Sequence, residues 1–278
     1  MDSTTSGEME RAAKRQKKVD DDRQLVLDYV RNDGRMLQYE SDESKNDRDV
    51  VMAAVAQYGK ALEWTSINLQ NDGEVVMTAV KNNGRAFEWA SEELRGDRDV
   101  VLTAVETWGM ALELVSPKLQ NDRSVVMAAV KQDFHALEWA SDKLKNEQWL
   151  LLIALAQDGD ALQWASARLK NNRKIVRVAL ANDALALQWA SGDLRNDRKL
   201  VLAAVAKDGY ALFYSTKLLQ DDRGVVMVAV KQNGMVLNYT NPLFKNDVGI
   251  VKAAMKQNRD AREYASLDLQ RRSFFWSM

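Results

Sequence analysis

One histidine, His135, is the only side chain of this 278-residue chain with an ordinary pKa close to neutrality. The chain has no cysteine, so it can form neither a disulfide nor a thiolate metal site. A single histidine is too few for a typical zinc site and leaves one candidate base for a serine nucleophile. We therefore expect His135 to be a surface histidine and not a catalyst.

Carboxylates and glycines do not form a catalytic pattern either. Aspartate and glutamate are abundant, but no pair stands apart from a regular repetition of the sequence, so no general acid and base can be nominated. The glycines recur 25 residues apart instead of clustering as in a phosphate-binding loop. We expect a protein that is not an enzyme and that binds no cofactor and no metal.

The charges of the chain nearly balance, with 39 basic against 40 acidic residues. Nucleic acid is therefore an unlikely partner, since no strong positive field would attract phosphates. No run of 18 apolar residues is present to span a membrane, and the polar N-terminus lacks the apolar stretch of a secretory signal. These features favour an intracellular protein of the cytoplasm or nucleus.

The charged and aromatic side chains are set in a 25-residue repeat, spelled DRDVVLTAVETWGMALELVSPKLQN over residues 97–121. Copies follow one another over residues 22–271 without insertion or deletion. They begin at Asp22, Asp47, Asp72, Asp97, Asp122, Glu147, Asn172, Asp197, Asp222 and Asp247. Such a repeat predicts one array whose units bury surface against their neighbours. Residues are numbered below by repeat position, from 1 to 25.

Apolar residues at positions 4, 5, 8 and 9 predict a long α-helix. Position 8 is alanine in nine copies, which predicts a close approach of two helices. Position 13 is glycine in seven copies, interpreted as a left-handed helix stop. Asp or Asn at position 12 can cap the next helix. Apolar positions 15, 16 and 19 predict a short second helix. Serine at position 20 then begins a tight turn, after which Asn at position 25 or Asp at position 1 caps the next long helix.

These elements predict an all-α fold, an α-solenoid of ten 25-residue two-helix repeats over residues 22–271. Residues 1–21 are expected to be a flexible polar tail with a helical stretch around Ala12 and Ala13. Its basic cluster Lys14–Lys18 is a candidate nuclear signal or a solvated charge run. Residues 272–278 are expected to cover the last repeat as an aromatic cap, or to form an exposed docking tail.

The repeat resembles that of the domain of unknown function 4116, with the pattern NDREVVLxAVxxxGxALEWASxxLKND. The matching residues are clearest at 121–126, 136–141 and Leu144, and the resemblance covers residues 22 to about 271. It implies a helical repeat array and supplies no catalytic residues.

Position 18 is aromatic in nine copies. These residues are Tyr39, Trp64, Trp89, Trp139, Trp164, Trp189, Tyr214, Tyr239 and Tyr264. A regular aromatic row can stack the bases of single-stranded RNA, but we favour a core spine between repeats. Arginine at position 2, present in seven copies, predicts an ion-paired ladder between repeats. Leu or Met at position 6 predicts core packing rather than an adaptable binding surface.

The central repeats depart from this pattern together. Trp108 replaces a cap residue, Phe134 replaces glycine, and Met110 and His135 occupy position 14, which is basic in the first three copies. Trp149 begins a stretch that is apolar on every side. Clusters of exposed aromatic residues mark interaction sites, although drift with local repacking is the alternative. The sequence therefore predicts a non-enzymatic protein-binding scaffold that contacts its partner through these five residues. The alternative is a single-stranded RNA-binding repeat protein that uses the position-18 row.

Overall fold

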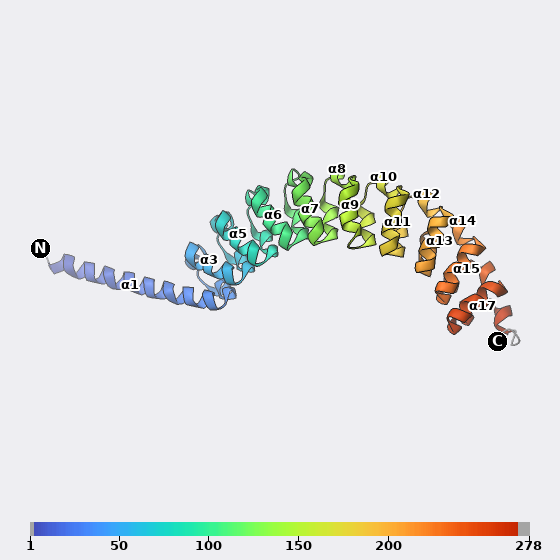
Figure 1. Ribbon diagram of the computed structural model, residues 1–278. Coiled ribbons are helices and arrows are strands. Elements are labelled where there is room, and N and C mark those ends of the chain that lie inside the picture. Colours follow the sequence, from blue (N-terminus) through green and yellow to red (C-terminus); the bar gives the residue numbers. More distant parts are fainter. Residues whose placement is uncertain (1–2, 272–278) are drawn as a thin grey trace. The chain divides into compact units, whose positions relative to one another are not determined.

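The computed structural model of the chain describes residues 3–271, and its regular elements are all helical (Figure 1). The chain divides after Ser141 into two compact units, called unit 1 and unit 2. In each unit the repeats stack in sequence order, and neighbouring long helices pack side by side. The predicted all-α solenoid of helical repeats is confirmed. The expected aromatic cap or tail at 272–278 lies outside the described residues.

Each repeat begins with a long α-helix that runs from position 2 to position 11. These helices are α3 (Arg48–Gln57), α5 (Gly73–Asn82), α6 (Arg98–Thr107), α7 (Arg123–Gln132), α11 (Arg173–Asn182), α13 (Arg198–Lys207), α15 (Arg223–Gln232) and α17 (Val248–Gln257). In the first repeat the helix is the end of α1 (Ser3–Asn32), and α9 (Gln148–Leu155) ends two residues early. The Asp or Asn at position 1 caps most of them. The Asp47 carboxylate, for example, accepts from the backbone N–H of Asp49 at 3.0 Å and of Val50 at 3.2 Å.

The second helix of each repeat is a six-residue 3-10 helix at positions 13–18. These helices are η1 (Gly34–Tyr39), η2 (Gly59–Trp64), η3 (Gly84–Trp89), η5 (Gly109–Leu114), η7 (Phe134–Trp139), η8 (Gly159–Trp164), η9 (Ala184–Trp189), η10 (Gly209–Tyr214), η11 (Gly234–Tyr239) and η12 (Arg259–Tyr264). Asp or Asn at position 12 caps most of them, as Asp33 accepts from the Arg35 N–H. In a 3-10 helix, side chains three residues apart lie directly above one another. Positions 14 and 17 therefore share one face of this helix.

The predicted tight turn at positions 20–24 is a third helical segment of about one turn. It is α-helical in α2 (Asp42–Lys45), α4 (Ile67–Gln70), α8 (Asp142–Lys145), α10 (Ala167–Lys170), α12 (Gly192–Arg195), α14 (Lys217–Gln220), α16 (Pro242–Lys245) and α18 (Leu267–Arg271). In two repeats it is a 3-10 turn, η4 (Leu94–Gly96) and η6 (Leu119–Asn121). Most position-23 side chains, such as Leu69 and Leu119, are buried and hold this segment on the repeat.

The core runs through each stack of repeats between the long helices and the 3-10 helices. In the second repeat Val51, Ala54 and Val55 of α3 and Leu62 of η2 are fully buried. Burying one such Val or Leu side chain contributes roughly 1.5–3 kcal/mol. Because the same positions are buried in successive repeats, the stabilisation is distributed along the stack and not gathered at one centre.

Glycine stands at position 13 for a different structural reason from the one expected. The described residues contain no glycine with positive φ, so the interpretation as a left-handed stop is wrong. A Cβ on Gly59 would lie 2.3 Å from the carbonyl oxygen of Ala79, which is position 8 of the following repeat. Gly34 and Gly234 meet Ala54 and Ala254 in the same way. Glycine and alanine together allow the backbones of adjacent repeats to approach closely, as the alanine pattern predicted.

The described part of the N-terminal segment is helical and continuous with the first repeat, whereas the sequence predicted a flexible tail. Helix α1 starts at Ser3, and its C-terminal part packs on α3. The described side chains between residues 11 and 22, which include Lys14–Lys18, are exposed to solvent. The first half of α1 thus extends past the packed repeat (Figure 1).

Candidate functional site

Interactions between neighbouring repeats account for much of the conserved pattern within the chain, beginning with the arginine at position 2. Its guanidinium pairs with the Asp at position 1 of the next repeat, 24 residues on. Nε–Oδ2 distances are 2.5 Å for Arg23–Asp47, 2.9 Å for Arg48–Asp72, 3.3 Å for Arg98–Asp122, 2.9 Å for Arg173–Asp197, 2.9 Å for Arg198–Asp222 and 2.7 Å for Arg223–Asp247. Since the same carboxylates cap the long helices, each joins two repeats. The predicted ion-paired ladder is confirmed.

Two further contacts repeat at the same boundaries. The hydroxyl at position 20 donates to the Asn side chain at position 25 of the preceding repeat, as Ser66 does to Asn46 at 2.6 Å. The amide oxygen at position 11 accepts from the N–H of the position-13 glycine one repeat earlier, as Gln57 does from Gly34 at 2.6 Å. These residues hold neighbouring repeats together, so we expect a binding site at other positions of the repeat.

Of the five residues nominated from the sequence, four are half-buried and one is exposed. Trp108, Met110 and Phe134 are half-buried, and His135 is exposed, all in unit 1. Trp149 is half-buried and belongs to unit 2.

Two of these residues have evident structural roles. The guanidinium of Arg85 lies over the Trp108 ring, 5.7 Å from its centroid, a cation–π contact. His135 Nδ1 lies 2.8 Å from the Asp133 carboxylate and its ring packs 4.0 Å from Phe134, centroid to centroid. These contacts account for Trp108, Phe134 and His135 by local packing. That these five residues form a binding site stays a prediction.

The aromatic row at position 18 is not the buried spine that we favoured. Its members are half-buried, except for Tyr39 and Tyr239, whose exposed fractions are 75% and 63%. Position 6 behaves similarly, since Leu27 is buried but Met52 and Met127 are half-buried. For position 18 the cause is the 3-10 geometry, which places positions 15, 16 and 19 in the core and leaves position 18 at its border.

In each unit, the side chains at positions 14, 17 and 18 of the 3-10 helices are together called the ridge. Positions 14 and 17 lie above one another within a 3-10 helix. Position 18 comes next to position 14 of the preceding repeat. The indole Nε1 of Trp189 donates to the Asp160 carboxylate at 3.0 Å, and the rings of Tyr210 and Tyr239 lie 6.4 Å apart. In unit 2 the ridge therefore connects repeat to repeat.

On unit 1 the ridge carries alternating charge. Arg35, Lys60 and Arg85 stand at position 14, and position 17 carries glutamate in four successive repeats. These glutamates are Glu63, Glu88, Glu113 and Glu138. Such a surface is well solvated and close to neutral, which is unsuitable for an anionic polymer.

On unit 2 the ridge loses its charge over three successive repeats. The residues there, called the aromatic patch, are Leu185, Gln188, Trp189, Tyr210, Phe213, Tyr214, Met235, Asn238 and Tyr239. Phe213 lies 6.0 Å from Tyr210 and 5.4 Å from Tyr239, centroid to centroid. All nine side chains are half-buried or exposed, and Tyr239 is the most exposed large apolar residue among them at 63%. The sequence-based search missed the patch.

A family model agrees with this architecture along most of the chain. The domain of unknown function (DUF4116) matches residues 22–69, 47–95, 97–145, 150–195, 179–220 and 222–270. The chain belongs to this family. No curated protein and no solved structure matches the chain significantly. Family membership thus agrees with the resemblance noted in the sequence and assigns the protein no activity.

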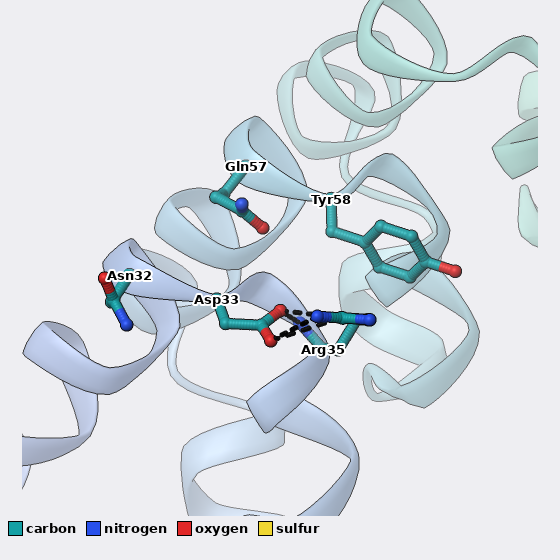
Figure 2. A pocket seen from close by; sticks show the side chains of 5 residues that line it. All are labelled: Asn32, Asp33, Arg35, Gln57 and Tyr58. Carbon is teal, nitrogen blue, oxygen red and sulfur yellow. Dashed lines mark hydrogen bonds and ion pairs between the residues drawn. The ribbon is translucent and has the colours of Figure 1, made fainter.

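Pockets of unit 1 lie between neighbouring repeats. One, of about 420 Å³, is lined by Asn32, Asp33, Arg35, Gln57 and Tyr58 (Figure 2). Arg35 Nη2 pairs with Asp33 at 2.8 Å and this hydrogen bond lowers the pKa of the carboxyl. Gln57 already bonds to the backbone at Gly34, so the polar groups of this pocket largely serve one another.

The second pocket, of about 500 Å³, lies between α6 and α7, where Leu102, Met127 and Lys131 contribute to its lining. It is a shallow part of the position-6 row. Within residues 3–271 no group of three or more His, Asp or Glu side chains is arranged to hold a metal ion. None of the helices described has the length and apolar character needed to cross a membrane.

Proposed function

We propose that this protein is a non-enzymatic scaffold that binds another protein through the aromatic patch of unit 2. The observation that supports this is the uncharged aromatic surface spanning three repeats of an otherwise highly charged chain. Interface centres are depleted of charge and enriched in Tyr, Trp, Phe and Met, and buried Tyr and Trp anchors supply much of the binding free energy. Tyr210, Phe213, Tyr239 and Met235 provide such anchors on a rigid helical support.

The experiment is site-specific photo-crosslinking. A photoreactive phenylalanine analogue replaces Tyr239 in the full chain, and a matched protein carries it at Tyr39. Tyr39 also occupies position 18 and is 75% exposed, but lies in unit 1. We expect a discrete cross-linked protein from cell extract with the probe at Tyr239 and not at Tyr39. An identical cross-linking pattern at the two sites would refute the patch as a specific interface.

Single-stranded RNA binding is the second candidate, because the position-18 row is half-exposed and base stacking needs accessible aromatic rings. The lack of cations on the ridge of unit 2 counts against it. The region from Trp108 to Trp149 remains an alternative protein contact, and a Trp108→Ala and Trp149→Ala double variant that loses the captured partner would favour it.

For localisation we propose that the exposed basic cluster Lys14–Lys18 of α1 is read by nuclear import machinery. Its full exposure supports recognition, and a solvated charge run is the alternative that the test distinguishes. A fluorescent fusion of the full chain tests the point. Nuclear enrichment that disappears on Lys17→Ala and Lys18→Ala substitution supports the signal, and an unchanged distribution contradicts it.

A further inference from the structure

We propose that two copies of the chain associate through α1, whose N-terminal half covers the open end of the first repeat of the other copy. The inference is independent of the proposed scaffold function, because it concerns unit 1 and not the aromatic patch. It follows from the exposed end of the first repeat, the segregation of charge along α1, and a spacing of side chains that is the same in both directions of the helix.

The first repeat exposes side chains that later repeats bury against a preceding repeat. Positions 1 and 8 face the preceding repeat, as the Arg–Asp ladder and the Gly–Ala contact show. Ala54, at position 8 of the second repeat, is fully buried, whereas the equivalent Tyr29 is 48% exposed. Leu25, at position 4, is 50% exposed. Asp22, at position 1, is exposed too, because residues 11–21 continue α1 instead of forming a preceding repeat.

An acidic groove adjoins this end of the repeat. Its volume is about 280 Å³, and its lining includes Asp22 of α1 and the side chains of Glu40 and Glu43 at the start of α2. Four carboxylates line the groove against a single guanidinium, that of Arg23, which is already paired with Asp47. The groove is therefore net acidic, and a group that covers it should be basic.

The N-terminal half of α1 is a basic segment of the required kind. Residues 11–18 contain five Lys or Arg and no Asp or Glu, and Asp20, Asp21 and Asp22 follow them. The described side chains of this half are exposed, and the helix extends past the packed repeat there (Figure 1). A helix of this length without packing is marginal in water, so a partner that packs on it would also stabilise it.

One face of α1 matches an antiparallel second copy. The residues on this face, separated by alternating steps of four and three, are Arg11, Arg15, Lys18, Asp22, Leu25 and Tyr29. The steps are the same from either end, so a copy that runs in the opposite direction aligns these residues in pairs, each formed twice. Lys18 then lies opposite Asp22, in place of a ladder arginine. Arg15 covers Leu25 with its aliphatic stem, and Arg11 lies over the Tyr29 ring.

Charge disfavours a parallel pair. In a parallel arrangement each residue of this face would meet its own copy, so all four charged residues would face like charges. On the flanks of the antiparallel pair, Val19 meets Val19 of the other copy. Asp21 meets Asp21, a single repulsion against the two Lys18–Asp22 pairs. The charges therefore select a second copy with a defined direction.

Analytical ultracentrifugation of the full chain over a concentration series tests the inference. We expect a dimer whose dissociation constant rises with salt, because its ion pairs are exposed to solvent. Lys18→Asp and Asp22→Lys each bring like charges together twice, and each should raise the dissociation constant by about tenfold or more. The double variant exchanges the two charges and should restore the dimer. A monomer at all concentrations, or a dimer that neither reversal weakens, overturns the proposal.

A mixture of the two single variants separates association between copies from an effect within one helix. Lys18 and Asp22 are four residues apart, so each reversal also affects the helix that carries it. In an equal mixture the charges are complementary between copies, while each helix keeps its like-charge pair. We expect heterodimers in the mixture, with circular dichroism checking that both variants are folded. A mixture as monomeric as its components would overturn the contact between copies.

Oxidative cross-linking tests the direction of the pair. The chain has no cysteine, so Val19→Cys adds a single thiol close to the twofold axis. A disulfide between copies should form there, whereas Ala13→Cys, on the opposite side of α1, should stay reduced. Equal cross-linking at the two sites overturns the antiparallel arrangement. None of these outcomes bears on capture of a protein at Tyr239, so the scaffold proposal is tested separately.

Discussion

Glycine at position 13 illustrates how a single missing atom sets the distance between two repeats. Its φ is ordinary in the described repeats, so backbone conformation does not require it. Glycine is required for lack of space, because the following repeat places a carbonyl oxygen against the position that a Cβ would occupy. In the seventh repeat alanine occupies this position as Ala184, and the Lys207 side chain of the next repeat instead caps carbonyls of α11, with 2.6 Å from Nζ to the Ala181 oxygen. The side chains at this contact therefore differ between repeats, while the backbones of adjacent repeats approach closely in both arrangements.

At the residue scale we predict that Gly59→Ala destabilises the protein and that Gly192→Ala does not. The new Cβ would lie 2.3 Å from the Ala79 oxygen at Gly59, whereas nothing lies within 4 Å at Gly192. Overpacking of this kind costs about 1–3 kcal/mol, and each kcal/mol lowers Tm by about 2–4 °C in chains of this size. Thermal unfolding followed by circular dichroism measures both variants. Equal Tm values for the two variants would contradict the close-approach explanation.

At the scale of the elements, the N-terminus of each long helix combines a helix cap with an ion pair to the preceding repeat. The carboxylate of Asp72 accepts from the backbone N–H groups of its own helix at 3.0 and 3.1 Å and also from the preceding Arg48. The Arg48 guanidinium, followed by burial and the backbone bonds, governs the pKa of this carboxyl, and the net effect lowers it. Asp47, Asp222 and Asp247 are held below their ordinary pKa in the same manner.

At the element scale we predict that the stack of repeats loses stability in acid. Because folding lowers the pKa of these carboxyls below about 3.8, their stabilisation is complete above that pH and is lost as pH falls through the folded-state pKa. Tm should therefore be nearly constant from pH 7 to 5 and fall below about pH 4.

An Arg48→Gln variant isolates one pair of the ladder. It should melt about 1–3 °C below the wild-type protein at pH 7, and the difference should shrink as the pH falls through the lowered folded-state pKa of the Asp72 carboxyl, where the ion pair is lost. A difference that stays constant with pH would mean that Arg48 acts through packing and not through its ion pair.

Over the whole molecule, the uniform repeat carries a surface that changes along the chain. The ridge is charged and mixed in unit 1 and uncharged over three repeats of unit 2. Because the ion-pair ladder, the caps and the core use other positions, the ridge can vary without loss of the fold. We therefore expect a binding site on the ridge, at positions that the ladder, the caps and the core do not use.

At this scale we predict that the protein does not bind single-stranded RNA in a salt-dependent way. Phosphate neutralisation dominates such binding. Of the three cations at position 14 of unit 1, Lys60 and Arg85 have a glutamate at position 17 of the same repeat, and Arg35 pairs with Asp33. Filter binding with a 20-residue oligouridine and a mixed-sequence RNA, at about 50 and 200 mM salt, should show no retention above background. Retention that falls with salt and is lost in Trp64→Ala and Trp89→Ala variants would instead support the aromatic row as a base-stacking platform.

The sequence by itself determined the repeat length, the core positions, the Asp and Asn caps and the Arg–Asp ladder. Each of these is local or recurs with the period of the chain, so a residue meets the same neighbours in every repeat. The tertiary structure decided why glycine stands at position 13, that the second helix is a 3-10 helix, and that the aromatic row lies at the border of the core. It also brought Tyr210, Phe213 and Tyr239 together. These depend on how closely adjacent repeats approach, a distance that the Gly–Ala contact sets in space and that the periodicity of the sequence does not contain.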